Sequence, residues 1–421
     1  MSARGRPLAP GGQTELQCER IAHGGVCVAR HDGRVVFVAD AVPGERVRAR
    51  ITEVKRSFAR ATALEALSPA PGRVPHVWPE ASIERDPDRR PGGAEFGHIE
   101  LALQRRLKAE VLRDAMLRFG GIRATAQLEA APGDEERRGL RWRTRVRLHI
   151  DAEGRVGPVA ARSHRVIPVA SLPLAHADIE ELAPLDGLDP DRPGSRLRGP
   201  GRIDFVAPAE HDSRMRIVRR GARPRPSATV TERAGGREFE VDEEGFWQIH
   251  AHAAEILFQA VRDAVSTERL DPRAQHLDLY GGVGLLAAAI GEAAGPAARI
   301  DTVEAFAPAT RHARSNLAEW RGARAVTARV SDYLREAEAD RLAGGTVVLD
   351  PPRAGAGREV ATALARLRPA QIVYVACDPV ALARDAGTLR QLGWRLETLR
   401  AFDLFPHTHH LEAVARFLPE A

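Results

Sequence analysis

From about Phe246 to the C-terminus, short apolar runs alternate with stretches whose apolar residues recur at helical spacing. Alternating strands and helices are typical of a mostly parallel sheet with helices on both faces. Ligands bind such sheets at the carboxyl ends of the strands. The sequence therefore predicts a Rossmann-like α/β domain over 246–421 whose chemistry lies where the runs end. These runs lie in AQHLDLYGG, ARIDTVEAF, GTVVLDPPR, QIVYVACDP, WRLETLRAFDLFP and LEAVARFL.

The residues before this half follow other patterns. Residues 13–67 carry alternating apolar residues broken by the turns HDG and PGE, which predicts a small five-strand β-barrel. Residues 95–119 have the spacing of one amphipathic helix, and the pattern returns to strands from 140 to 240. We therefore expect a barrel over 1–70, a β-rich central domain containing this helix over 71–245, and the α/β domain over 246–421.

Composition narrows the class of protein. No apolar stretch is long enough to cross a membrane, and the first residues lack an apolar signal core, so we expect a cytoplasmic protein. Three cysteines are too few for a disulfide framework or a four-thiolate metal site. The 62 basic residues exceed the 57 acidic ones and are nearly all Arg. An RNA-binding surface and a merely Arg-rich proteome both account for that excess.

The run LDLYGGVGLLAAAIG joins an apolar strand to a helix through a glycine-rich turn. Gly282 and Gly284 allow the backbone to turn sharply and to approach a ligand closely. The next strand ends in Glu304, where a carboxylate accepts hydrogen bonds from both ribose hydroxyls. A dinucleotide site needs a third glycine beside the pyrophosphate, which this turn lacks. The pattern therefore favours S-adenosylmethionine over a dinucleotide.

Three further strand ends carry reactive side chains. Asp332, in VSDYL, either bonds an adenine amino group or caps a helix. Asp350, in VVLDPPRAG, precedes two prolines that exclude helix and ladder pairing, so a rigid acidic loop could hold a substrate amide or amino group. Arg353 in the same loop is either a phosphate ligand or a stabilising partner. Cys377 follows the buried run IVYVA, where sheet proteins place their chemistry.

Five motifs occur together in one order: FWQIH, LDLYGGVG, LDPPRAG, YVACDPVALARD and FPHTHHLEAVA. In order and spacing they resemble the RNA (uracil-5-)-methyltransferases, which make 5-methyluridine in transfer and ribosomal RNA. The resemblance covers nearly the whole chain, because 13–67 looks like the RNA-binding TRAM barrel of that family. It implies a class I methyltransferase that uses S-adenosylmethionine and binds RNA, with ribosomal RNA modestly favoured and no obligate protein partner.

The resemblance also implies roles for single residues. Cys377 corresponds to the nucleophile and Glu412 to the general base. A thiolate that adds to C6 of uracil makes C5 able to attack a methyl sulfonium, and a carboxylate then removes the C5 proton, so no metal is needed. The helix after Cys377 is expected to lower the thiol pKa. Gln248, Tyr280, Glu304 and Asp350 correspond to family positions that line the cofactor and uracil pockets. Asp350 and Arg353 correspond to the substrate-facing wall.

Several positions depart from the family pattern. Asp378 stands where the family usually has Asn, and we expect its carboxylate to point away from the thiol or to cap the helix. His250 replaces a common Asn, and Gly281 replaces a common Cys.

Many family members carry an iron–sulfur cluster that needs four thiolates. Ala94 and Leu172 occupy two of the cluster positions here, so we expect no cluster. Cys18 and Cys27 are expected to be core residues of the barrel. The spacing of His407, His409 and His410 makes a poor metal-ligand set.

Two rival interpretations stay open from the sequence. One is a methyltransferase that acts on cytosine or on a small molecule through the same half-sheet. The other is an RNA-binding protein with a degenerate site. The pairing of Cys377 with Glu412 favours a working uracil methyltransferase over both.

Overall fold

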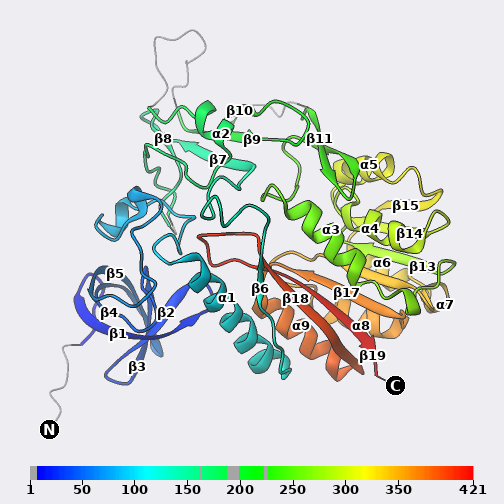
Figure 1. Ribbon diagram of the computed structural model, residues 1–421, viewed down its shortest axis with the longest axis horizontal. Coiled ribbons are helices and arrows are strands. Elements are labelled where there is room, and N and C mark those ends of the chain that lie inside the picture. Colours follow the sequence, from blue (N-terminus) through cyan, green and yellow to red (C-terminus); the bar gives the residue numbers. More distant parts are fainter. Residues whose placement is uncertain (1–6, 162, 187–198, 222–225, 421) are drawn as a thin grey trace.

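The computed structural model describes residues 7–161, 163–186, 199–221 and 226–420. The chain forms a barrel, a central sheet and a large α/β sheet in sequence order, and α1 lies between the barrel and the large sheet (Figure 1). Within the described ranges, no helix is both long and apolar enough to cross a membrane.

Five strands close the N-terminal barrel in the order β1-β2-β3-β5-β4, as the sequence predicts. Val47, Ala49 and Ile51 of one strand point into the core and are buried, whereas the intervening arginines are exposed or only partly buried. Cys18 and Cys27 are buried in the same core, which confirms that they are packing residues. The strands are β1 (Gln13–Ala22), β2 (Val26–His31), β3 (Arg34–Ala39), β4 (Arg46–Val54) and β5 (Phe58–Ser68).

The central part contains a four-stranded sheet of order β10-β9-β7-β8 and a separate β11–β12 hairpin. Its helix is shorter than predicted, because α1 starts at Leu101 and ends in a π-type turn. The elements are η1 (Pro79–Ala81), η2 (Pro87–Arg89), α1 (Leu101–Ala115), η3 (Met116–Gly120), β6 (Leu128–Ala130), β7 (Arg145–Ile150), β8 (Val156–Gly157), α2 (Ala177–Leu182), β9 (Gly201–Val206), β10 (Arg214–Arg219), β11 (Thr229–Ala234) and β12 (Arg237–Asp242).

The C-terminal half forms the predicted mostly parallel sheet, of order β15-β14-β13-β16-β17-β19-β18-β6. Its first five strands are parallel, and β19 is antiparallel to both β17 and β18. The strands are β13 (Gln275–Leu279), β14 (Arg299–Glu304), β15 (Gly322–Thr327), β16 (Thr346–Leu349), β17 (Gln371–Ala376), β18 (Trp394–Asp403) and β19 (Glu412–Pro419). The helices are α3 (Ala253–Ala264), η4 (Thr267–Arg269), α4 (Leu285–Ala294), α5 (Ala307–Asn316), α6 (Val330–Glu336), α7 (Ala339–Leu342), α8 (Gly357–Leu367) and α9 (Pro379–Gln391).

Both faces of this sheet are covered, because successive side chains of a strand point to opposite faces. Val373 and Val375 share one apolar cluster with α3 and α4, whereas Ile372 and Tyr374 share the other with α8 and α9. Every residue of β17 is buried as a result. The strand that leads to Cys377 is thus held rigidly between two helical layers.

Elements from outside 246–421 complete this sheet. β6 pairs in parallel with β18, with Leu128 opposite Ala401, and α1 packs against α9. The β11–β12 hairpin also contributes Phe239 and Val241 to the core around α3. A three-residue strand carries no periodic signal, so the sequence could not assign β6 to the sheet. The domain boundaries expected at 70 and 245 stay predictions, although contacts cross the second one.

Candidate active site

The carboxyl ends of β13, β14, β16 and β17 meet at one edge of the sheet, where a cavity of 690 Å³ opens. The first residue of antiparallel β19 reaches the same edge. Eight of the residues that the sequence singles out line this cavity. They are Gln248, Tyr280, Gly282, Glu304, Asp350, Arg353, Cys377 and Glu412.

Asp332 is the exception. It is neither at a strand end nor the cap of its helix, because α6 begins at Val330 and Arg329 is the cap. Its side chain is 53% exposed and forms an ion pair with Arg335, one turn further along the helix. Asp332 does not line the cavity, so its expected contact with a cofactor is not supported by its position. The helix starts three residues earlier than it would if Asp332 were its cap.

The glycine-rich turn lies between β13 and α4. Gly282 has φ of 54° and Gly284 has φ of 92°, in the left-handed region that favours glycine. Glu304 accepts hydrogen bonds from the N–H groups of Gly282, at 3.3 Å, and of Phe306, at 2.7 Å. These bonds fix the carboxylate against the turn and orient it at the cavity wall.

Gly281, which replaces the family's usual Cys, is required by its neighbours. A Cβ atom at this position would overlap the Thr302 hydroxyl and the Asp278 carboxyl. Asp278 is fully buried beneath the turn and accepts hydrogen bonds from Thr302 Oγ1 at 2.9 Å and from the Ala287 N–H at 3.2 Å. The buried polar pair therefore takes the space that a side chain at 281 would need.

The side chains of this half of the cavity fit S-adenosylmethionine. Two aromatic rings, Phe246 and Phe306, line the cavity although they are 74% and 57% exposed. Exposed rings beside a cavity offer flat apolar faces on which a purine can stack. Glu304 offers acceptors for ribose hydroxyls, and the glycine turn leaves room for close approach. Sequence patterns did not reveal a role for the two rings, whose only signal is their place within the motifs FWQIH and DTVEAF.

Cys377 and Glu412 are brought together by the pairing of β17 with β19. The antiparallel register places Ala376 opposite Ala413, so the residues just beyond each, Cys377 and Glu412, face one another. Both side chains line the same cavity. Thirty-four residues separate Cys377 from Glu412 in the sequence, so local patterns did not reveal that the two side chains lie close together, although the family resemblance implied it.

The expected lowering of the Cys377 pKa is wrong for this structure. Burial and, to a smaller extent, the carboxylates of Glu412 and Asp350 together raise the pKa of the thiol to about 12, whereas Arg353 opposes them. The N-terminal end of α9 does not outweigh two nearby carboxylates in a site with little water. The thiol of the free protein is therefore protonated at neutral pH.

The two carboxylic acids beside the thiol have raised pKa values. Burial raises the pKa of Asp350 to about 7, with a smaller contribution from Asp278. Burial and the neighbouring Asp350 raise the pKa of Glu412 well above its usual range, while Arg353 lowers it. Glu412 is 5% exposed, and its Oε2 atom has no hydrogen-bond partner in the part of the chain that the structure describes. Once ionised, a carboxylate with a raised pKa accepts a proton more readily than an ordinary one.

Asp378 caps the helix that follows the cysteine, as we expected from the sequence. Its Oδ1 accepts hydrogen bonds from the N–H groups of Val380, at 3.0 Å, and Ala381, at 2.8 Å. Its Oδ2 lies 2.8 Å from His23 Nε2, on the barrel. The carboxylate is thus directed away from the cavity, and it does not line it.

Asp385, at the end of the motif YVACDPVALARD, anchors the loop that carries Asp350 and Arg353. Its Oδ2 accepts hydrogen bonds from Tyr374 Oη and from the Ala356 N–H, both at 2.7 Å, and its carboxylate also bonds the Gly357 N–H. Asp385 is 5% exposed. Sequence reasoning gave this residue no role, because its partners are 11 to 29 positions away.

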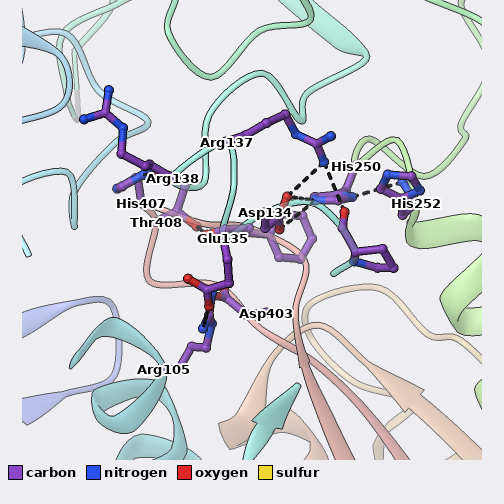
Figure 2. A network of polar contacts seen from close by, with 12 residues as sticks. Arg105, Asp134, Glu135, Arg137, Arg138, His250, His252, Asp403, His407 and Thr408 are labelled. Carbon is purple, nitrogen blue, oxygen red and sulfur yellow. Dashed lines mark hydrogen bonds and ion pairs between the residues drawn. The ribbon is translucent and has the colours of Figure 1, made fainter. Parts of the chain in front are cut away.

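His250, the last residue of the motif FWQIH, is held by a buried polar network (Figure 2). His250 Nε2 donates to Asp134 Oδ2 at 3.1 Å, and its Nδ1 accepts from the His252 N–H at 3.0 Å, which fixes the orientation of the ring. The ring also stacks on Trp142, with centroids 5.6 Å apart. The backbone of Thr144 bonds Ile249, next to Gln248. His250 is therefore a fixed support for the wall of the cavity.

The loop FPHTHH is fastened to α1. Gln104 donates to His407 Nδ1 at 3.0 Å, and His407 Nε2 donates to the Arg138 carbonyl at 2.8 Å. Burial lowers the pKa of His407 and takes that of His410 to about 3, so both rings are neutral. His410 accepts a hydrogen bond from Arg353 at 3.3 Å. In the part of the chain that the structure describes, no group of three His, Cys, Asp or Glu side chains could hold a metal ion.

Ala94 and Leu172, at two of the family's cluster positions, belong to one apolar cluster with Trp78. They are 2% and 4% exposed. Apolar packing thus occupies the place where thiolates would be needed.

Comparisons with known proteins agree with this geometry. Residues 238–418 match the family described as tRNA (Uracil-5-)-methyltransferase, and residues 12–64 match the TRAM domain. An uncharacterized RNA methyltransferase of Streptomyces avermitilis is 36% identical over 98% of this chain and 99% of its own length. The 23S rRNA (uracil(1939)-C(5))-methyltransferase of Alkalilimnicola ehrlichii is 30% identical over 99% of both chains.

The fold is shared with a solved structure, the Pyrococcus abyssi tRNA (uracil-54, C5)-methyltransferase in complex with S-adenosyl-L-homocysteine. The match has a TM-score of 0.68 at 19% identity and covers 96% of this chain and 99% of that one. It supports the predicted class I methyltransferase architecture together with the barrel and the central part.

Proposed function

The chain belongs to the RNA (uracil-5-)-methyltransferases, which use S-adenosylmethionine, and we propose that it methylates a uridine of ribosomal RNA through a covalent cysteine adduct. One observation carries the proposal. Cys377 lies beside two carboxyl groups with raised pKa values, those of Glu412 and Asp350. The same cavity also contains the glycine-rich turn and Glu304.

The residues divide the cavity into two parts. Glu304, Gly282, Tyr280 and Gln248 hold the cofactor, which supplies a methyl group on a sulfonium when it is bound. Asp350 and Arg353 face the uracil ring, which is a neutral base with both donors and acceptors on its edge. The target base must leave its stack to enter the cavity, as bases do in enzymes that modify them.

Cys377 and Glu412 perform the chemistry. The sulfur adds to C6, and the electron pair of the C5=C6 bond moves toward O4, which makes C5 nucleophilic. After C5 has taken up the methyl group, Glu412 accepts the C5 proton, the S–C6 bond breaks and the double bond re-forms. Because the resting thiol is protonated, the addition also requires a proton acceptor, and the raised pKa of Asp350 or Glu412 makes either carboxylate suitable once ionised.

Ribosomal RNA is the favoured substrate. The relative from Alkalilimnicola, whose name gives 23S rRNA as its substrate, matches along 99% of this chain, including the TRAM barrel. Arg, the main basic residue, pairs with phosphates and stacks on bases. We place the enzyme in the cytoplasm, where ribosomal RNA is modified, and without an iron–sulfur cluster, because apolar packing fills two cluster positions.

Two variants test the covalent route with the full chain, the methyl donor and RNA. Glu412→Gln keeps the size of the side chain but cannot accept the C5 proton, so labelled RNA should migrate with the protein on a denaturing gel. Cys377→Ala should remove both turnover and this cross-linked species. The control is the double variant, which should give no cross-link. Turnover by Cys377→Ala, or no cross-link with Glu412→Gln, would contradict these roles.

The substrate is tested separately by mapping 5-methyluridine in cells that lack the protein. We expect one 5-methyluridine to disappear from ribosomal RNA and all transfer RNA positions to stay methylated. Loss of a transfer RNA methyl group alone would refute the ribosomal assignment and leave the enzyme class unchanged.

A further inference from the structure

The first turn of the barrel reaches the cysteine loop of the α/β domain. Residues 22–25, which are the last residue of β1 and the turn before β2, surround a gap of only 20 Å³ together with Cys377, Asp378 and Pro379. Cys377 thus lies between two spaces, with the large cavity on one side and the barrel turn on the other.

This contact is closely fitted. A Cβ atom at Gly25 would come within 2.7 Å of His409 Cβ and 3.1 Å of the Phe96 ring. Gly25 also has φ of 72°, so a larger residue would be strained as well as crowded. The turn therefore rests against the loop FPHTHH without room for a side chain, which fixes His23 near the helix that begins after Cys377.

His23 and Asp378 form the polar contact at the centre of this interface. His23 Nε2 is 2.8 Å from Asp378 Oδ2, while Oδ1 of the same carboxylate holds the N–H groups of Val380 and Ala381. The two side chains are 50% and 21% exposed, so solvent screens the pair only in part. The contact joins residues 355 positions apart and so joins the two domains directly.

The contact between His23 and Asp378 affects the pKa values of both side chains, and Asp378 in turn affects that of Cys377. Asp378 is one of the acids that raise the pKa of the Cys377 thiol, after burial, Glu412 and Asp350. On α9, Arg384 lowers the pKa of His23, but the hydrogen bond to Asp378 outweighs it and raises the His23 pKa overall. Burial would raise the pKa of Asp378, and the bonds from His23 and the helix lower it instead.

The remaining charged groups near the gap already have partners. Lys108 on α1 donates to Asp403 at 2.6 Å and to the Phe405 carbonyl at 3.0 Å. His409 lies 3.7 Å from Glu95. Neither side chain is hydrogen-bonded to Asp378, whose side-chain partner is His23.

We propose that His23 is a positioning residue for methyl transfer: its protonated ring neutralises Asp378 and holds it in the cap of α9, so that the Cys377 thiolate forms beside a neutral pair. The proposal rests on the assignment of Cys377 as the nucleophile. It explains how a carboxylate can stand where the family usually has a neutral Asn. It also makes the seating of the RNA-binding barrel a condition for forming the nucleophile.

The test is the rate at which N-ethylmaleimide labels Cys377 in the free protein, read from the Cys377 peptide by mass spectrometry. His23→Gln keeps a hydrogen-bond donor for Asp378 but cannot carry a charge. We expect labelling near pH 6.5 to slow about 3- to 10-fold, which corresponds to a rise of roughly half to one unit in thiol pKa. The effect should shrink as the pH rises above the pKa of His23, because the unmodified ring then loses its charge as well.

The decisive comparison is the same substitution in the Asp378→Asn background. With no carboxylate to neutralise, His23→Gln should leave the labelling rate of Asp378→Asn unchanged. His211→Gln, on the loop between β9 and β10, is the matched control and should behave as the unmodified protein does. Equal slowing in both backgrounds, or no slowing in either, would overturn the proposal.

Labelling requires neither RNA nor a methyl donor, so the result stands apart from the assignment of the nucleophile. If Cys377→Ala retained turnover, the proposed function would fail while the coupling of His23 to the thiol could still be measured. In turnover, the acidic limb of the methyl-transfer rate should move to higher pH in His23→Gln and stay in place in the double variant.

Discussion

Replacing Asp350 by Asn should stabilise the fold while abolishing activity, and the stabilisation should depend on pH. The folded state holds this carboxyl at a pKa of about 7 instead of 3.8, because it is buried beside Asp278. Below about pH 4 the carboxyl group of Asp350 is protonated in both the folded and the unfolded chain, so its ionisation does not change the free energy of unfolding. Between about pH 4 and 7 the unfolded chain ionises first, and the folded state loses stability as pH rises.

The size of the effect follows from the shift. A change of about 3 units corresponds to about 4 kcal/mol at 1.36 kcal/mol per unit. Asp350 is partly exposed to the cavity, and water there weakens the destabilisation. We therefore expect Asp350→Asn to raise the free energy of unfolding by about half of that maximum, or roughly 2 kcal/mol at pH 8. In a domain of this size, that amounts to about 4–8 °C in the unfolding midpoint.

The assay is thermal unfolding of the full chain across this pH range, with methyl transfer measured in parallel. Asp350→Asn should unfold at a higher temperature than the unmodified protein at pH 8, and this difference should shrink steadily as the pH falls toward about 4. Asp332→Asn, whose carboxylate is exposed, is the control and should show no such pH-dependent gain. A difference that is constant with pH, or a variant less stable at pH 8, would refute the reasoning.

Three further predictions concern neighbouring features. Gly281→Ala should destabilise the fold by about 1–3 kcal/mol, because the new Cβ overlaps Thr302, and an unchanged unfolding midpoint would show that the turn can move. Asp385→Ala should speed amide hydrogen exchange at Ala356 and Gly357, since their acceptor is lost; unchanged protection would show that the loop has other supports. Protein purified without oxygen should contain no stoichiometric iron and show no visible absorbance, whereas a bound cluster would disprove the expected absence.

Much of the fold could be predicted because its signals are local. Alternation with a period of two identified the barrel strands, and short apolar runs between helical stretches identified the parallel sheet. Parallel strands present their carboxyl ends at one edge, so the sequence alone was enough to assign Glu304, Asp350 and Cys377 to one site. Asp332 failed this reasoning, because the helix α6 begins before it and carries its side chain to the surface.

The tertiary structure decided what depends on distant contacts. β6 joins the sheet through pairing with β18, which lies far along the chain, and Asp385 acts on backbone groups of another loop. The pKa of Cys377 is raised, whereas the sequence predicted that it is lowered. The reason is that burial and the carboxylates of Glu412 and Asp350 have a larger effect on the thiol than the N-terminal end of α9. The sequence by itself determined the candidate site residues, by local pattern for Glu304, Asp350 and Cys377 and by family resemblance for Glu412. Packing determined their protonation and placed His23 of the barrel against Asp378, because electric fields and contacts depend on distance in space, which the order of residues does not encode.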